Sequence, residues 1–153
     1  MTDLAAHGGL VLRLYELRRD PELRRARAWF ASEFHPEGPE PVLALLRGGH
    51  DASAAYRMVT TYWEMAAALV NHGALDRGLF LAANTEHLVV YGKLAPHLDA
   101  LRALIREPDY LQELEALVTS IPDVGPRLEK RRRVLEGWRG TAALALSAPQ
   151  RNP

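Results

Sequence analysis

The stretch "YRMVTTYWEMAAALVNHGALDRGLF", residues 56–80, decides how the chain can fold. Its apolar side chains recur three and four residues apart, which is the spacing of a helix face. Two such stripes run side by side. One contains Ala55, Met58, Tyr62, Met65, Leu69 and His72, and the other contains Tyr56, Val59, Trp63, Ala66 and Val70. Since a surface helix shows one apolar stripe, the pair predicts a long, doubly apolar central helix that is buried over most of its circumference.

This central helix is expected to be the hub of a helical bundle or to pack against a second copy of the chain. The small run Ala66–Ala68 would let a neighbouring helix come close. Asp51 is placed to cap the start of the helix. Gly73 is placed to end it in the left-handed conformation that glycine adopts easily.

A polar face of the same helix carries Arg57, Glu64 and Asn71, spaced by seven residues. Steps of seven drift by only about 20°, but each rises about 10.5 Å, too far for Arg57 to bond Glu64 unless both side chains stretch. In one interpretation Glu64 pairs with an arginine of another helix and fixes how the two helices cross. In the other, the three residues line a ligand pocket with Tyr62 and Trp63. The first is favoured, because paired carboxylates are more often structural than catalytic.

Two helices are expected on the N-terminal side of the central helix. Leu10, Leu14 and Leu17 share one face of the first. Asp20 and Pro21 begin the second, as N-cap and first helical residue. The loop "HPEGPEP" at 35–41 and the short apolar segment "VLALLR" follow.

On the C-terminal side, Asp76 is expected to cap a short helix, and Asn84 or Thr85 to start the next. Pro96 then either kinks that helix or separates two helices, because a proline inside a helix removes one backbone hydrogen bond. Two later helices are predicted, the first opening near Pro108. Their inward-facing residues are expected to be Leu111, Leu114 and Val118 in the first, and Leu128, Leu135 and Trp138 in the second.

No alternation typical of strands and no hairpin signal interrupts these helical patterns. We therefore expect an all-α fold, a single-domain bundle of about seven helices over residues 1–146. Residues 147–153 are expected to form a frayed tail.

The composition is that of an ordinary soluble domain, with 153 residues, 48% hydrophobic and 25% charged. The net charge of zero gives no general attraction to nucleic acid or anionic lipid, so nucleic-acid binding is not favoured. The arginine-rich segments 17–27 and 127–139 also contain acidic residues that can neutralise them. No long apolar run and no signal peptide occur, so we expect a cytoplasmic protein without a membrane partner.

Residues for metal binding and catalysis are poorly placed. Cysteine is absent, which excludes disulfides, thiolate metal sites and a cysteine nucleophile. None of the histidines forms the Glu-x-x-His motif that di-iron bundles use, and no serine sits in a Gly-x-Ser-x-Gly elbow. We therefore predict no metal, no cofactor and no catalytic residue. The histidines are His7, His35, His50, His72, His87 and His97.

The run from "RARAWFASEFHP" through "YWEMAAALVNHGALDRGLF" to "LAPHLDALR" resembles a family of small all-helical bacterial domains of unknown function. The resemblance spans residues 11–120. It implies an all-helical fold and no assigned activity. The matching positions are Trp63, Glu64, Gly73, Leu75, Asp76 and Arg102.

Two hypotheses for the function follow. The first is a non-enzymatic helical interaction module that self-associates, most simply as a homodimer, or docks a partner protein. The alternative is a small-ligand-binding or enzymatic bundle with its pocket around Glu64, Arg57 and Asn71.

Overall fold

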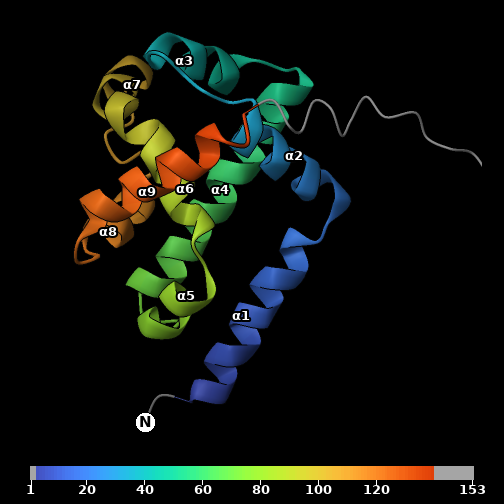
Figure 1. Cartoon of the computed structure of the whole chain (residues 1–153), viewed down its shortest axis with the longest axis vertical. Helices are drawn as coiled ribbons and strands as arrows, with labels where there is room; N and C mark the ends of the chain where they lie inside the picture. Colours follow the sequence, from blue (N-terminus) through green and yellow to red (C-terminus); the bar gives the residue numbers. More distant parts are fainter. Residues whose placement is uncertain (1–2, 140–153) are drawn as a thin grey trace, which may run out of the picture.

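The computed structural model describes residues 3–139, and within this range the chain contains helices and no strand (Figure 1). The all-α prediction is confirmed. The helices are α1 (Leu4–Arg18), α2 (Pro21–Ser32), α3 (Pro39–Arg47), α4 (Asp51–Asn71), α5 (Arg77–Ala83), α6 (Glu86–Leu94), α7 (Leu98–Ile105), α8 (Gln112–Thr119) and α9 (Val124–Glu136), with a 3-10 turn η1 (Ala95–His97). No helix among these residues has the length and apolar content that crossing a membrane requires.

The central helix α4 is the hub of the bundle, packing against α2, α3, α5, α6 and α8. One predicted stripe is buried along its whole length, from Tyr56 to Val70. The second stripe is buried at Tyr62 but not at Met65, whose side chain is 44% exposed. Burial therefore covers less of the circumference of α4 than the two stripes suggested.

Several helix ends lie where local signals placed them, but Asp51 does not cap α4 as expected: His50 is the N-cap residue without a side-chain capping bond, and Asp51 is the first residue of the helix. The Asp20 carboxylate accepts hydrogen bonds from the backbone N–H groups of Glu22 (2.9 Å) and Leu23 (3.0 Å), and Pro21 begins α2. Asp76 caps α5 through the N–H of Leu79 at 2.7 Å. Gly73 follows α4 with φ of 77°, the left-handed conformation expected of it.

Pro96 separates two helices and does not kink one. It lies in η1, between the end of α6 at Leu94 and the start of α7 at Leu98. The single 3-10 turn accommodates the missing N–H of the proline, and the chain continues in a new helix.

Two expectations for the C-terminal helices are wrong. Helix α8 begins at Gln112, not near Pro108, because Leu111 has a φ of 56° and breaks the helical path. Leu135 of α9 is buried, but Trp138 lies past the end of α9 and is 54% exposed, so Trp138 does not face the core. The predicted end of the domain at 146 and the tail 147–153 lie outside the described residues.

Little of helix α1 is covered by the rest of the chain. Figure 1 shows it at the edge of the molecule, where it packs against α5 and α2. Only His7 and Leu14 of this helix are buried. Two of the hydrogen bonds that hold it involve these buried positions: the Tyr62 hydroxyl donates to the carbonyl of Leu14 at 2.7 Å, and the backbone N–H of Asp76 donates to His7 Nδ1 at 2.6 Å.

Candidate functional site

The polar strip of α4, defined as Arg57, Glu64 and Asn71, binds the ends of neighbouring helices. Arg57 Nη1 donates to the carbonyl of Gly48 at 2.9 Å, just past the end of α3. It also lies 3.4 Å from the carbonyl oxygens of Leu45 and Leu46. A cation is favourable here, because the C-terminal end of a helix carries partial negative charge and unpaired carbonyls.

Glu64 caps the start of α8. Its two carboxylate oxygens accept hydrogen bonds from the backbone N–H groups of Glu113 (3.0 Å) and Leu114 (2.8 Å), the second and third residues of that helix. The residue at the N-cap, Leu111, has no side-chain acceptor, so Glu64 supplies from another helix what a local Asp or Ser usually supplies. The partner of Glu64 is thus a helix end, not the arginine expected from the sequence.

The surroundings of Glu64 act on its carboxyl in two opposite directions. Burial raises the pKa of its carboxyl above the ordinary value for glutamate, while the hydrogen bonds from Leu114 and Glu113 act in the opposite direction. The hydrogen bonds to α8 therefore offset the cost of burying the Glu64 carboxylate only in part.

Asn71 holds the same end of α8 from the side. Its amide nitrogen donates to the Glu113 carbonyl at 2.9 Å and to Glu113 Oε2 at 2.8 Å. His72 Nε2 lies 3.2 Å from Glu113 Oε1. Hydrogen bonds from Asn71 and His72 lower the pKa of Glu113. Glu64 and Asn71 together fix where α8 begins.

Tyr62 and Trp63 point away from this strip. The Tyr62 hydroxyl binds α1, and the indole N–H of Trp63 donates to Glu86 Oε1 of α6 at 3.3 Å. The five residues expected around one ligand pocket all lie on α4, but their side chains bind four different neighbours: α1, the end of α3, α6 and α8. Three hollows in the described part of the chain, two of about 580 Å³ and one of about 210 Å³, are lined by other residues.

A charged cluster around Glu86 was not foreseen. Arg27 grips its carboxylate through Nε at 2.8 Å and Nη2 at 2.6 Å, and Arg18 adds a third contact at 3.1 Å. The Arg18 guanidinium also lies 5.3 Å from the centre of the Trp63 ring. Burial alone would raise the pKa of Glu86, but the hydrogen bonds and charges of the two arginines outweigh it and lower that pKa. The cluster ties α1, α2, α4 and α6 together.

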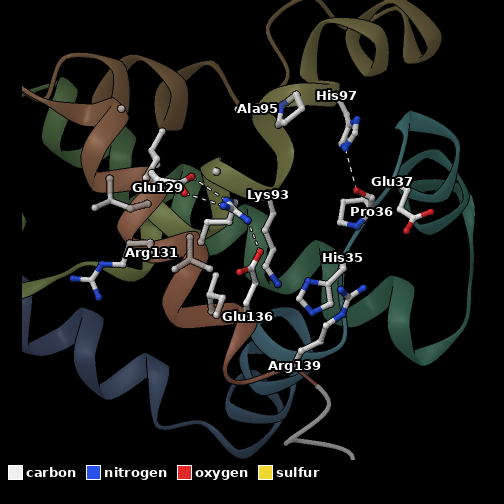
Figure 2. Close-up of a pocket in the computed structure, with 18 residues that line it drawn as sticks. His35, Pro36, Glu37, Lys93, Ala95, His97, Glu129, Arg131, Glu136 and Arg139 are labelled. Carbon is white, nitrogen blue, oxygen red and sulfur yellow. Dashed lines mark hydrogen bonds and ion pairs between the residues drawn. The ribbon is translucent and has the colours of Figure 1, made fainter.

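One of the larger hollows lies between α6, η1 and α9, with His35, Lys93 and Arg139 gathered at one end (Figure 2). Lys93 Nζ donates to three carbonyls at the end of α2, those of Phe30 (2.7 Å), Ala31 (2.9 Å) and Phe34 (2.7 Å). Burial lowers the pKa of Lys93 to about 8, and the charge of Arg139 adds to the shift. Lys93 is thus another helix-end cap.

Metal ligands are not brought together in residues 3–139, where no group of three or more histidine, aspartate or glutamate side chains is placed to hold a metal ion. His35 Nε2 lies 3.0 Å from the carbonyl of Ser32, and His97 Nε2 lies 3.1 Å from that of Pro36. These two histidines therefore make hydrogen bonds within the fold, His35 to the end of α2 and His97 from η1 to the loop before α3.

The uncovered face of α1 forms a continuous stripe. Its members recur at helical spacing, and three of them are large and apolar: Leu4 is 64% exposed, Leu12 66% and Tyr15 58%. A Cβ built on Gly8 would meet no atom within 4 Å. We call this set the α1 stripe. It consists of Leu4, Gly8, Leu12, Tyr15 and Arg19.

Comparison with known proteins places the chain in a family. Residues 4–121 match the family described as a domain of unknown function (DUF4760), and the chain belongs to it. This range contains α1 to α8 and so includes both the polar strip of α4 and the α1 stripe. No curated protein matches the chain. No solved structure matches it either.

Proposed function

We propose that this member of the DUF4760 family is a non-enzymatic interaction module that self-associates as a dimer through the α1 stripe. The observation that carries the proposal is the exposure of Leu4, Leu12 and Tyr15 on one face of a helix. From Leu4 to Arg19 the stripe is about 22 Å long, enough for a helix–helix seam. Contiguous apolar surface of this kind favours burial against a partner.

Gly8 supports a close approach by another helix. Glycine in a helix costs about 1 kcal/mol relative to alanine, so its presence within α1 calls for a reason. The surroundings of Gly8 in the described chain supply none, because an added Cβ would lie in open space. A partner helix packed over Gly8 would supply one, since a missing side chain lets two backbones come near.

The stripe is suited to a second copy of itself. Its spacings are nearly the same in either direction, so an antiparallel pair places Leu12 against the partner's Leu12 and Gly8 against the partner's Tyr15. Arg19, which has no ion partner among residues 3–139, then lies near the partner's Asp3. Such a self-complementary contact is what a two-fold dimer requires.

Sedimentation velocity on the wild type, Leu12→Arg and Leu104→Arg tests the proposal. Leu104 is a matched control, because it is 45% exposed and lies in α7, at the opposite end of the molecule from α1 (Figure 1). We expect a dimer for the wild type and for Leu104→Arg, and a monomer for Leu12→Arg. A wild type that is monomeric at micromolar concentration would contradict the proposal.

Folding is monitored alongside mass. Since Leu12 is exposed in the single chain, its replacement should change the free energy of unfolding of the monomer by no more than about 0.5 kcal/mol. Helical circular dichroism and a melting curve taken on Leu12→Arg at a concentration where the wild type is also dissociated separate loss of association from loss of fold.

A further inference from the structure

The smallest of the three hollows, about 210 Å³, lies between the start of α6, the turn before α9, and α9 itself. Its wall combines apolar residues with an unusual concentration of unpaired polar groups. The lining residues used below are Thr85, His87, Arg127, Lys130 and Arg131.

His87 is the most informative of these. It is only 1% exposed, and neither ring nitrogen has a hydrogen-bond partner in the described structure. Its ring packs 5.2 Å from that of Phe80 and 5.9 Å from that of Trp63, centre to centre, so the ring is held from the core side. A buried polar group without a partner is costly, and such groups in native proteins commonly mark a site for water, an ion or a ligand.

The cations facing the hollow are not neutralised by neighbouring carboxylates. Within residues 3–139, Arg127, Lys130 and Arg131 make no ion pair. On the same helix α9, Arg132 and Arg133 both pair with Glu129. The arginine-rich helix therefore has one self-neutralised face and one face whose positive charge is directed to the hollow.

The start of α6 adds to this positive environment. Thr85 is the N-cap residue of that nine-residue helix, and its hydroxyl makes no capping bond. Unpaired N–H groups and the positive end of the helix dipole attract anions at such a position. The nearest carboxylate along the chain, Glu86, is bound by Arg27 and Arg18 and does not compete.

We propose that this hollow binds a phosphate group, either as inorganic phosphate or as a small phosphomonoester. Arg127, Lys130 and Arg131 supply the charge, the first turn of α6 supplies N–H donors, and His87 offers a hydrogen bond from the floor. A tetrahedral anion matches this convergence of donors from several directions better than a planar carboxylate does. A hollow of about 210 Å³ has room for one phosphate and several waters. The site is separate from the α1 stripe.

Isothermal titration with inorganic phosphate and with glycerol 2-phosphate, at constant ionic strength, tests the proposal. We expect saturable binding of one anion per chain. Lys130→Gln and Arg127→Gln should each weaken binding about tenfold, the effect of losing one charged hydrogen bond. Arg133→Gln, which removes the same charge from the same helix away from the hollow, should leave the affinity within about twofold.

Nuclear magnetic resonance of the His87 ring gives an independent readout. Bound phosphate should shift its ring nitrogen signals, and Lys130→Gln should need about ten times more phosphate than the wild type to reach half of the full shift. Tighter binding of glycerol 2-phosphate would identify a phosphomonoester as the ligand, and tighter binding of inorganic phosphate would identify the free ion. Absence of saturable binding of both, or equal weakening by Arg133→Gln, would overturn the proposal.

Discussion

Helices α4 and α1 show two opposite uses of a helix surface. In α4, even the polar residues of the strip are engaged: Arg57 binds the end of α3, while Glu64 and Asn71 bind the start of α8. In α1, large apolar residues such as Leu12 and Tyr15 contact solvent. The polar side chains of α4 satisfy the unpaired backbone groups of neighbouring helix ends, whereas α1 leaves apolar side chains exposed.

This difference directs the search for a function to α1 and away from the polar strip of α4. A carboxylate inside a bundle suggests a binding site, but both oxygens of Glu64 accept hydrogen bonds from the N–H groups that it caps. An exposed apolar stripe has no such internal explanation, because burial is what stabilises apolar side chains. The function of this chain is therefore better sought on α1 than inside the bundle.

The largest expected effect concerns how α1 is attached. Glu86→Ala removes the carboxylate shared by Arg18 of α1 and Arg27 of α2, leaving two poorly exposed guanidinium groups without their partner. We expect a loss of about 3 kcal/mol in the free energy of unfolding, measured by urea denaturation. Glu16→Ala, which removes the exposed pair of Arg13 on α1, is the control and should cost less than about 1 kcal/mol. Equal losses would mean that the Glu86 cluster does not anchor α1.

The stability of the fold should also depend on pH, because His87 is buried in the core beside α4. Burial, followed by the charge of Arg131, lowers the pKa of His87 to about 4, below the ordinary 6.5. Between these two values the unfolded chain binds a proton that the folded chain does not, so stability falls as the pH is lowered through this window. The loss amounts to about 3 kcal/mol in all.

Urea denaturation at a series of pH values from about 7 down to about 4, which spans this window, checks that prediction. His87→Leu keeps a side chain of similar size and removes the titrating group, so its stability should decline less over the same range. Identical declines for the wild type and His87→Leu would show that other groups cause the acid sensitivity.

A smaller effect is expected at the polar strip. Glu64→Ala leaves two N–H groups of α8 without an acceptor and should cost about 2 kcal/mol, while Glu64→Gln keeps one acceptor oxygen and should cost about 1 kcal/mol. Hydrogen exchange at the amides of Glu113 and Leu114 gives the local readout and should quicken in both variants. Thr61→Ala, an exposed change on α4, is the control. Unchanged exchange at these amides would remove Glu64 from its role as a cap.

The smallest expected effect comes from alanine substitutions of Gly8, on the α1 stripe, and of Gly9, beside it. Gly8→Ala should stabilise the monomer by about 0.5–1 kcal/mol, because alanine favours the helix and an added Cβ meets no atom. The same change should weaken the dimer, since it fills the space reserved for the partner's Tyr15. Gly9→Ala is the matched control: its Cβ is equally free and it lies off the α1 stripe, so it should stabilise the monomer without weakening association. Sedimentation equilibrium on both variants measures the dimer constants.

Much of the fold could be predicted from the sequence, because the signals that start and stop helices are local. Asp20 and Asp76 cap amides within three residues of themselves, and Gly73 sets its own backbone angle. The burial of the stripe from Tyr56 to Val70 also follows from spacing along one helix.

The partners of polar residues could not be predicted in the same way. Glu64 and the two backbone N–H donors that it binds on α8 are 49 and 50 residues apart, and Arg27 reaches Glu86 across 59 residues. Periodicity says which face a side chain occupies, but not what packs on that face. For this reason Trp138 was expected inside and is exposed, and the uncovered state of Leu12 was not foreseen.

The most direct test of the account is disulfide trapping at Leu12. The chain contains no cysteine, so Leu12→Cys introduces the sole thiol, and Leu104→Cys, equally alone and exposed, serves as its control. In an antiparallel pair of α1 helices the two copies of residue 12 meet at the two-fold axis, within the short distance that a disulfide spans. The account predicts that mild oxidation links Leu12→Cys into covalent dimers much faster than Leu104→Cys. Equal rates of linkage would contradict the dimer through α1.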